Sequence, residues 1–499
     1  MGAEHPADES GLSRRDFLER TAYAAGVAGA AGLSADAILA EAAQATGRFS
    51  GLPSPRNVPI DHFVLLMMEN RSFDHYFGWL HGQADGKQRQ RYANPEGELV
   101  STRHASTLGS GGVEWKGCGH PDPGHGWNSG RAQLDGGFLA EGSENDEFAL
   151  CYYNRGELGF IHEAARSYTL YDRYFCSILA GTWPNRYYKW SAQSGGLKTN
   201  TLETGGNSWE TIFDRAIAHG LTVRYYYSDL PFGLLFGARA IPWIAPISRY
   251  YADAAAGTLP NIAIVDPAYG DGGGSDGLSA DEHPLGDVRL GQAFQADVVR
   301  SFTESPNYRR GALFIMYDEW GGFFDHVRPP RVPDDRASAD QNEDFGQLGF
   351  RVPAVAISPW SRNRQPKGYG RYGGWWNSPR WRVDHGQYAH ESILSFISYR
   401  FGLGFLTKRH RFARNIGHSL DWWRRPDFEP PELPDPPTIV TRPCALGGQD
   451  VEDSLEAHAS DLADLAHQAE RLRAPVYEAT PDMIFTKPDS VKQAIKAAP

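Results

Sequence analysis

Two adjacent pairs of oxygen-bearing side chains are the first candidates for chemistry. Glu69-Asn70 and Asp318-Glu319 each directly follow an apolar run that predicts a buried strand. Functional side chains in an open α/β sheet gather beyond the carboxyl ends of its strands, so the two pairs would meet if those strands are neighbours. Three carboxylates and an amide oxygen suit one divalent cation, because unpaired carboxylates in one cleft repel each other. The alternative for each pair is a helix N-cap or a turn.

A hydroxyl nucleophile is offered by Thr182 in the segment TWPNR. Pro184 is typical of the first turn of a helix, which predicts Thr182 or Trp183 as the N-cap. A hydroxyl at that position faces free backbone N–H groups and the positive end of the helix dipole, and both favour an anionic phosphate. The alternative is that Thr182 only caps the helix.

Histidines complete the candidate set, since imidazole is the commonest general acid and base near neutral pH. Six of the 17 histidines lie in Pro/Gly-rich loops, in short acidic motifs or at a predicted helix start: His120, His125, His283, His326, His385 and His390. A histidine in a loop is otherwise a solvated surface residue.

The motifs occur in an order that is recognisable. IDHFVLLMMENRSFDHYFG, HGWN, TWPNR, DEHP, YDEWGGFFDHVRPP and DHGQYAHESIL follow one another over about residues 58–405. Together they resemble the bacterial phosphoesterase family that holds secreted phospholipases C and a respiratory-burst-inhibiting acid phosphatase, a family related to the alkaline phosphatase superfamily. The resemblance implies an α/β sandwich around a central sheet, one divalent metal ion of unspecified identity, and a hydroxyl that attacks phosphorus.

The resemblance also implies roles for individual residues. Glu69, Asn70, Asp318 and Glu319 match the metal ligands, Thr182 matches the nucleophile, and His125, His283 and His326 match catalytic histidines. Acid phosphatases of this family carry a further histidine where this chain has Glu282. That departure argues against an acid-phosphatase assignment.

The elements that must position these residues follow from short apolar runs. Predicted strands are His62–Met68, Leu221–Tyr227, Asn261–Val265, Ala312–Tyr317 and Val352–Ser358, and predicted helices include Trp209–Ala218, Leu290–Ser301 and His390–Tyr399. Buried strands that alternate with helices indicate an α/β fold, a three-layer sandwich with a mainly parallel central sheet. We expect this alkaline-phosphatase-like catalytic domain to span about residues 58–425.

The two ends of the chain have other predicted roles. Arg14-Arg15 precede an Ala/Gly-rich apolar stretch and a small-residue cleavage site at Ala43–Ala45, which predicts a twin-arginine (Tat) signal peptide over residues 1–45. The alternative is a short amphipathic helix. Residues 426–499 begin with six prolines in twelve residues, a predicted linker, and continue into a helical tail over Val451–Leu472.

Composition limits the function classes. The 499 residues are 41% hydrophobic and 22% charged, an ordinary globular composition, and the formal net charge of −12 argues against nucleic-acid binding. The four cysteines are scattered without CxxC spacing, which argues against a zinc site but permits disulfides in three pairings. The low-complexity segment Gly270–Gly277 is a flexible loop or, alternatively, a calcium-binding loop.

Three functions remain open. The first is an exported, metal-dependent, phospholipase-C-like enzyme whose substrate is a phospholipid, with transient contact to a membrane surface. The second is a phosphomonoesterase acting on small phosphoesters, and the third is a non-catalytic exported binding protein. Aromatic rings near the site would favour a choline head group, with candidates Trp115, Trp127, Trp183 and Tyr187, whereas a pocket lined by Lys and Arg would favour monoesters.

Overall fold

The computed structural model describes residues 51–105, 115, 117, 120–203, 205–270, 279–284, 286–364, 380–435 and 462–476. The predicted signal peptide, nearly all of the predicted calcium loop and the first half of the predicted tail helix lie outside the described residues. Among the helices that are described, none combines the length and the apolar character needed to cross a bilayer.

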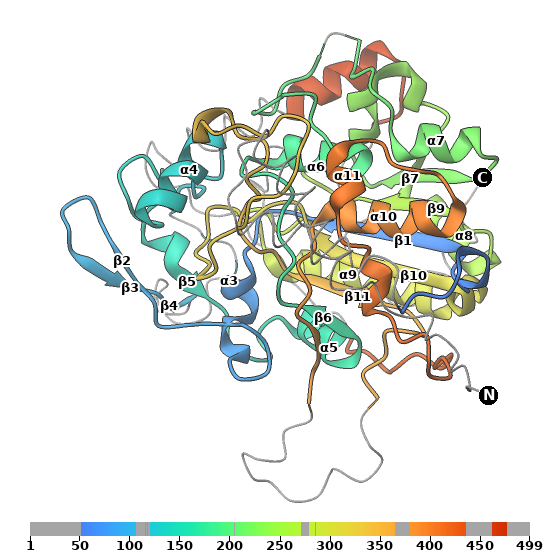
Figure 1. The fold of residues 1–499 in the computed structure, drawn as a ribbon, viewed down its shortest axis with the longest axis horizontal. Coiled ribbons are helices and arrows are strands. Elements are labelled where there is room, and N and C mark those ends of the chain that lie inside the picture. Colours follow the sequence, from blue (N-terminus) through green and yellow to red (C-terminus); the bar gives the residue numbers. More distant parts are fainter. Residues whose placement is uncertain are drawn as a thin grey trace, which may run out of the picture.

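An eight-stranded sheet forms the centre of the molecule, in the order β12-β6-β11-β10-β1-β9-β7-β8 (Figure 1). Only β11 runs antiparallel to its two neighbours, so the predicted mainly parallel sheet is confirmed. The strands are β1 (His62–Met68), β6 (Thr169–Tyr171), β7 (Val223–Tyr227), β8 (Ile244–Pro246), β9 (Ile262–Val265), β10 (Gly311–Tyr317), β11 (Ala354–Ile357) and β12 (Arg382–Asp384).

The sequence of the central strands explains their position. β1 and β10 are continuous apolar runs whose residues are buried on both faces, as expected for strands covered by helices on each side. All five predicted strands exist, with ends that move by up to two residues. The three further strands β6, β8 and β12 have three residues each, too few for a periodic pattern to be visible in the sequence.

Helices cover both faces of the sheet and complete the predicted three-layer sandwich. α5 (Gly159–Ser167), α8 (Ile247–Ala256) and α9 (Val288–Glu304) pack together on one face. On the other face, α6 (Thr182–Ser191) contacts both α7 (Ile212–Ala218) and α10 (His390–Phe401) (Figure 1). The remaining α-helices are α3 (Phe73–Phe77), α4 (Trp127–Gly136) and α11 (Lys408–Phe412).

Smaller elements surround this sandwich. Two two-stranded sheets pair β2 (Arg91–Ala93) with β3 (Leu99–Ser101) and β4 (Arg103–His104) with β5 (Cys151–Tyr152). In the described part of the tail, residues 462–471 are helical, and Leu462 and Leu465 pack into the main core. Cys151 and Cys176 are buried, whereas Cys118 and Cys444 lie outside the described residues.

Candidate active site

The two predicted oxygen-bearing pairs lie side by side because β1 and β10 are parallel neighbours in register, with Met68 opposite Tyr317. The backbone N–H of Asp318 donates to the carbonyl of Met68 at 3.0 Å. The Asp318 carboxylate in turn accepts from the backbone N–H of Asn70 at 3.2 Å. These bonds fix Glu69-Asn70 and Asp318-Glu319 at one edge of the sheet.

A tight turn after Glu319 makes this approach possible. Gly321 has a φ of +63°, and a Cβ at this position would lie 2.1 Å from the carbonyl oxygen of Asn70. Only glycine adopts that conformation without strain and leaves room for the opposing backbone. The glycine turn therefore lets the two strand ends come together.

Each carboxylate at this edge keeps one oxygen without a hydrogen-bond partner. The unpartnered atoms are Glu69 Oε2, Asp318 Oδ2 and Glu319 Oε1, all on fully buried side chains. Buried carboxylate oxygens normally find a donor, and an exception calls for an unseen ion or water. Three such oxygens on neighbouring residues are a donor set that a hard divalent cation prefers, so the residues fit the expected metal.

A third strand end adds a residue that the sequence prediction missed. Asp266 directly follows β9, the other neighbour of β1. The buried Arg186 guanidinium donates to Glu69 at 2.7 Å and to Asp266 at 2.9 Å, and its Nε lies 3.6 Å from Asp318. Lys189 pairs with Asp266 at 3.3 Å. Asp266 follows the same strand-end rule that identified Glu69 and Asp318, so the sequence did contain its signal.

The charges of this cluster do not cancel. Arg186 and Lys189 face the four carboxylates of Glu69, Asp266, Asp318 and Glu319. If all four are ionised, Arg186 and Lys189 leave two negative charges, and the protonated His125 beside Glu319 offsets one of them, so the cluster keeps a net negative charge that a cation would balance. Burial, with repulsion from Asp318, raises the pKa of Glu69 and of Glu319 well above the usual range, although Arg186 and His125 oppose the shift.

Thr182 is the first residue of α6 and is 4% exposed. Its Oγ1 lies 3.5 Å from Asn70 Oδ1, so the predicted nucleophile adjoins the predicted ligands. The prediction that Thr182 or Trp183 is the N-cap was wrong, because Gly181 takes the extended cap conformation. Asn200 accepts the free N–H of Trp183 at 2.9 Å. The hydroxyl of Thr182 is therefore not needed as a cap.

Two of the predicted histidines meet across one carboxylate. The rings of His125 and His283 are 5.8 Å apart, and Asp122 Oδ2 lies 3.7 Å from a nitrogen of each. Burial alone would lower the pKa of His125, but Glu319 and Asp122 raise it to about 9. His125 Nε2 lies 3.9 Å from Glu319 Oε1, so this charged imidazole adjoins the oxygen cluster.

His326 belongs to a second cluster instead. Its ring nitrogens contact Asp74 at 2.5 Å and Asp85 at 3.2 Å, and Arg351 pairs with both Asp74 and Asp325. Every carboxylate oxygen of Asp74 and Asp325 accepts a hydrogen bond. This cluster therefore leaves no carboxylate oxygen of Asp74 or Asp325 without a donor, unlike the edge of β1 and β10.

The other three candidate histidines hydrogen-bond or pair with residues other than Thr182. His390 is buried and donates to the carbonyl of Asp318 at 2.8 Å, which supports the end of β10 from behind. His120 contacts Asp146 and the largely exposed His385 contacts Asp172. None of these contacts suggests proton transfer to a substrate.

Glu282 turns away from the histidine that follows it. Its carboxylate accepts from the hydroxyls of Tyr76 and Tyr317 at 2.6 and 2.5 Å and from the amides of Gln292 and Gln295 at 2.7 and 2.8 Å. The residue is 1% exposed and has a φ of +74°, a strained value for a side chain other than glycine. Four donors thus hold this turn, and with it the backbone of His283.

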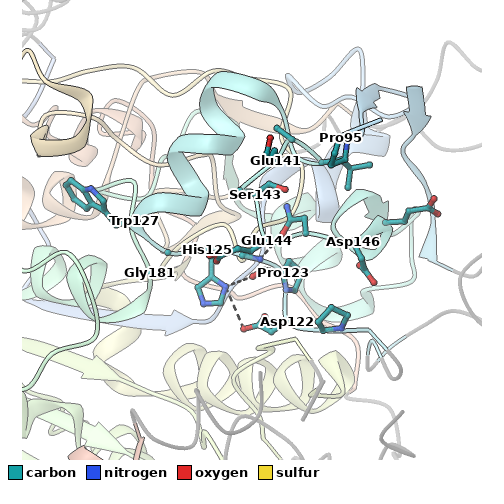
Figure 2. Close-up of a pocket in the computed structure, with 18 of the residues that line it drawn as sticks. Pro95, Asp122, Pro123, His125, Trp127, Glu141, Ser143, Glu144, Asp146 and Gly181 are labelled. Atoms are coloured by element: carbon teal, nitrogen blue, oxygen red, sulfur yellow. Dashed lines mark hydrogen bonds and ion pairs between the residues drawn. The ribbon is translucent and has the colours of Figure 1, made fainter. Parts of the chain in front are cut away.

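A cavity of about 1000 Å³ opens above Thr182 and His125. Figure 2 shows His125 directed toward Asp122 and Pro123 within it, with Glu141, Glu144 and Asp146 around the wall. Lys198 is the one lysine or arginine among the described lining residues, and it already pairs with Glu343 at 2.7 Å. The cavity is therefore acidic and lacks the Lys/Arg lining expected for a monoesterase.

The four aromatic residues considered for a choline cage do not form one. Trp127 lines the cavity, but the Arg131 guanidinium lies 3.4 Å from its ring centroid and Lys198 lies 4.9 Å from it. Trp115 stacks on Tyr153, whereas Trp183 and Tyr187 pack in the core. Carboxylates, rather than aromatic faces, are what this cavity presents to a cation.

Comparisons with known proteins show which proteins this chain is similar to. The model of the Phosphoesterase family matches residues 60–404. The chain is 30% identical to non-specific phospholipase C1 of Arabidopsis thaliana over 449 residues, covering 82% of this chain and 79% of that protein. It is also 30% identical to non-hemolytic phospholipase C of Pseudomonas aeruginosa, covering 85% and 65% of the two chains. A crystal structure of an alkaline phosphatase superfamily protein from Vibrio parahaemolyticus matches 76% of each chain with a TM-score of 0.35 and 10% identity.

Proposed function

Because the chain belongs to the Phosphoesterase family and is a phospholipase-C-like hydrolase of phosphoric esters, we propose that it cleaves phospholipid phosphodiesters with Thr182 as nucleophile. The observation that carries this proposal is the meeting of three groups beside one cavity, which Thr182 and His125 line and which the buried carboxylates adjoin through these two residues. The three groups are the Thr182 hydroxyl, the unpartnered carboxylate oxygens, and the charged His125.

The ligands of the proposed cation are Glu69, Asn70, Asp318 and Glu319. The unpartnered oxygens and uncompensated charge of the three carboxylates support this role, as does Asn70, which contacts Asp318 through its backbone N–H and Thr182 through its Oδ1. When bound there, a divalent cation supplies polarisation of a phosphoryl oxygen and a lowered pKa for the hydroxyl beside it. Arg186 donates to Glu69 Oε1, which leaves Oε2 for the cation, and its Nε lies 3.6 Å from Asp318 Oδ2.

The residues of the chain support a two-step displacement. Thr182 Oγ forms a bond to phosphorus while the bond from phosphorus to the diacylglycerol oxygen breaks. His125, protonated near neutral pH, gives its proton to that leaving oxygen. The proton that Thr182 loses on attack passes to solvent. In the second step water attacks phosphorus and gives a proton to the now neutral His125, the Oγ–phosphorus bond breaks, the Thr182 oxygen takes a proton back from solvent, and the head group leaves as a phosphomonoester. His283 and Asp122 orient His125 from the other side.

The acidic cavity favours a diester over a monoester. A phosphomonoester dianion carries one more negative charge than a diester, and the lining carboxylates of Asp122, Glu141, Glu144 and Asp146 repel it. A lysine that is already paired offers little compensation. These features support a phosphodiester with an uncharged or cationic head group as the substrate.

A side-by-side assay tests this order of substrates. The purified protein is expected to show a higher kcat/KM on p-nitrophenylphosphorylcholine than on p-nitrophenyl phosphate. The expected margin is about tenfold or more, from one unfavourable charge in a partly desolvated site. A higher kcat/KM on the monoester would reverse the proposal in favour of a phosphatase, and activity on neither would favour a binding protein.

Export by the twin-arginine route is also part of the proposal and rests on Arg14, Arg15 and the apolar stretch that follows them. Replacing both arginines by lysine is expected to leave unprocessed precursor inside the cell, because the Tat machinery reads this pair. The measurement is the ratio of precursor to mature protein in cell and medium fractions. Unchanged secretion of the double variant would contradict the twin-arginine assignment.

A further inference from the structure

The β2–β3 hairpin stands at the mouth of the active-site cavity. It forms its own two-stranded sheet, with Tyr92 opposite Val100 and Ala93 opposite Leu99. In Figure 1 the hairpin projects from the edge of the molecule, away from the central sheet. Asn94, Pro95 and Val100 line the same cavity as Thr182. The hairpin is therefore the part of the chain that a large substrate meets beside the opening.

The two faces of this hairpin differ. Tyr92 packs on Phe138 with ring centroids 5.2 Å apart, so the face that carries Tyr92 and Val100 is anchored on the body of the protein. Because side chains alternate along a strand, Leu99 lies on the opposite face, where it is 62% exposed. A single exposed leucine is ordinary, but this one lies on the rim of a cavity assigned to a lipid.

The charge of the residues around the cavity mouth determines which kind of membrane surface this face can bind. Exposed glutamates surround the opening on the hairpin and on the loop before β5, namely Glu96, Glu98, Glu141, Glu144 and Glu147. Arg103 pairs with Glu147, and Arg91 is an exposed arginine on the same hairpin, so the five glutamates outnumber the two arginines and the rim stays acidic. A bilayer of zwitterionic phospholipids presents its ammonium groups outermost, whereas an anionic bilayer presents negative charge. The rim complements the first and repels the second.

We propose that the cavity mouth, formed by residues 91–101 and 139–147, docks on the surface of a zwitterionic bilayer with Leu99 inserted among the head groups. This proposal rests on the proposed function, because a phospholipid must bring its phosphate to Thr182 while its acyl chains are still partly embedded in the bilayer. Docking of this face puts the opening of the cavity against the head-group layer, where the scissile bond lies. Val100, on the opposite face of the hairpin from Leu99, and Pro95 supply apolar surface inside the cavity.

The test compares Leu99→Thr with a matched control, Ile217→Thr. Threonine is a good strand former and keeps the hairpin, while it removes most of the apolar contact. Ile217 is 46% exposed on α7, on the opposite side of the molecule from the hairpin in Figure 1. The measurements are co-sedimentation with phosphatidylcholine vesicles, hydrolysis of those vesicles, and kcat/KM on soluble p-nitrophenylphosphorylcholine.

Leu99→Thr is expected to weaken vesicle binding and vesicle hydrolysis about tenfold, the effect of losing one inserted side chain, and to leave the soluble substrate unaffected. Ile217→Thr is expected to change none of the three. Leu99→Trp is expected to strengthen vesicle binding, because tryptophan prefers the membrane interface. Vesicles of phosphatidylglycerol are expected to bind the wild-type protein more weakly than phosphatidylcholine vesicles.

Equal vesicle binding by wild type, Leu99→Thr and Leu99→Trp would overturn the docking surface, as would tighter binding to phosphatidylglycerol. An equal loss on the soluble substrate would show that Leu99 supports the fold of the site instead. Co-sedimentation does not require turnover. Failure of the proposed function, seen as no hydrolysis of any substrate, is therefore distinguishable from failure of docking.

Discussion

Thr182→Ala is expected to lose at least about 10³-fold in kcat, because removal of a covalent nucleophile leaves only binding and electrostatic stabilisation. The fold should persist, since Gly181 caps α6 and the threonine hydroxyl makes a single long contact of 3.5 Å. The expected loss of stability is therefore within about 1 kcal/mol. The measurements are single-turnover and steady-state rates together with a thermal unfolding curve.

Thr182→Ser is the matched control, because it keeps the hydroxyl and removes only a methyl group. We expect it to retain most of the activity. Acid quenching during turnover should trap phosphorylated Thr182, which mass spectrometry can locate. An alanine variant with nearly normal kcat would show that water attacks phosphorus directly and that Thr182 is not the nucleophile.

Removal of the bound cation is the second large effect that we expect. Strong chelation should abolish turnover, and a divalent cation added back should restore it. Asp318→Asn keeps an oxygen acceptor for the backbone N–H groups of Asn70 and Glu319 but removes the charge and one ligand. It should lower both the metal content, measured by elemental analysis, and kcat by about 10²-fold or more.

The pH dependence of the metal effect has a definite sign. The pKa values of Glu69, Asp318 and Glu319 are raised in the folded protein, chiefly by burial. A carboxyl group whose pKa is higher in the folded protein than in the unfolded chain contributes stability at pH values below its unfolded pKa. That contribution is lost as the pH rises through its folded pKa. The cation should therefore raise Tm more at pH 8 than at pH 5. A fully active protein that contains no metal would contradict this whole assignment.

Much of the site could be predicted because strand ends are visible in the sequence. Glu69 and Asp318 follow long apolar runs, and the carboxyl-end rule needs only that pattern. Asp266 follows a shorter run and obeys the same rule, yet that β9 lies next to β1 is a fact of tertiary structure. Strand order is set by packing between segments some 200 residues apart, which no local pattern records.

Other features could not be predicted for different physical reasons. The direction of β11 is invisible because a strand buried on both faces has the same apolar pattern whether parallel or antiparallel. Arg186 lies four residues after Thr182, but a charged residue on a helix usually faces solvent. It is buried here because three carboxylates surround it. The start of α6 was misplaced because glycine can cap a helix without any side chain.

The four hydrogen-bond donors around Glu282 restrict which residues can replace it. Four donors on three separate elements converge on this one carboxylate, and its backbone is already strained. A histidine introduced there alone would leave several buried donors without acceptors, and its ring would face the core rather than the substrate. Replacement of Glu282 by histidine in this chain is therefore expected to need concerted substitution of Tyr76, Tyr317, Gln292 and Gln295, because each of these donors would otherwise lose its buried acceptor.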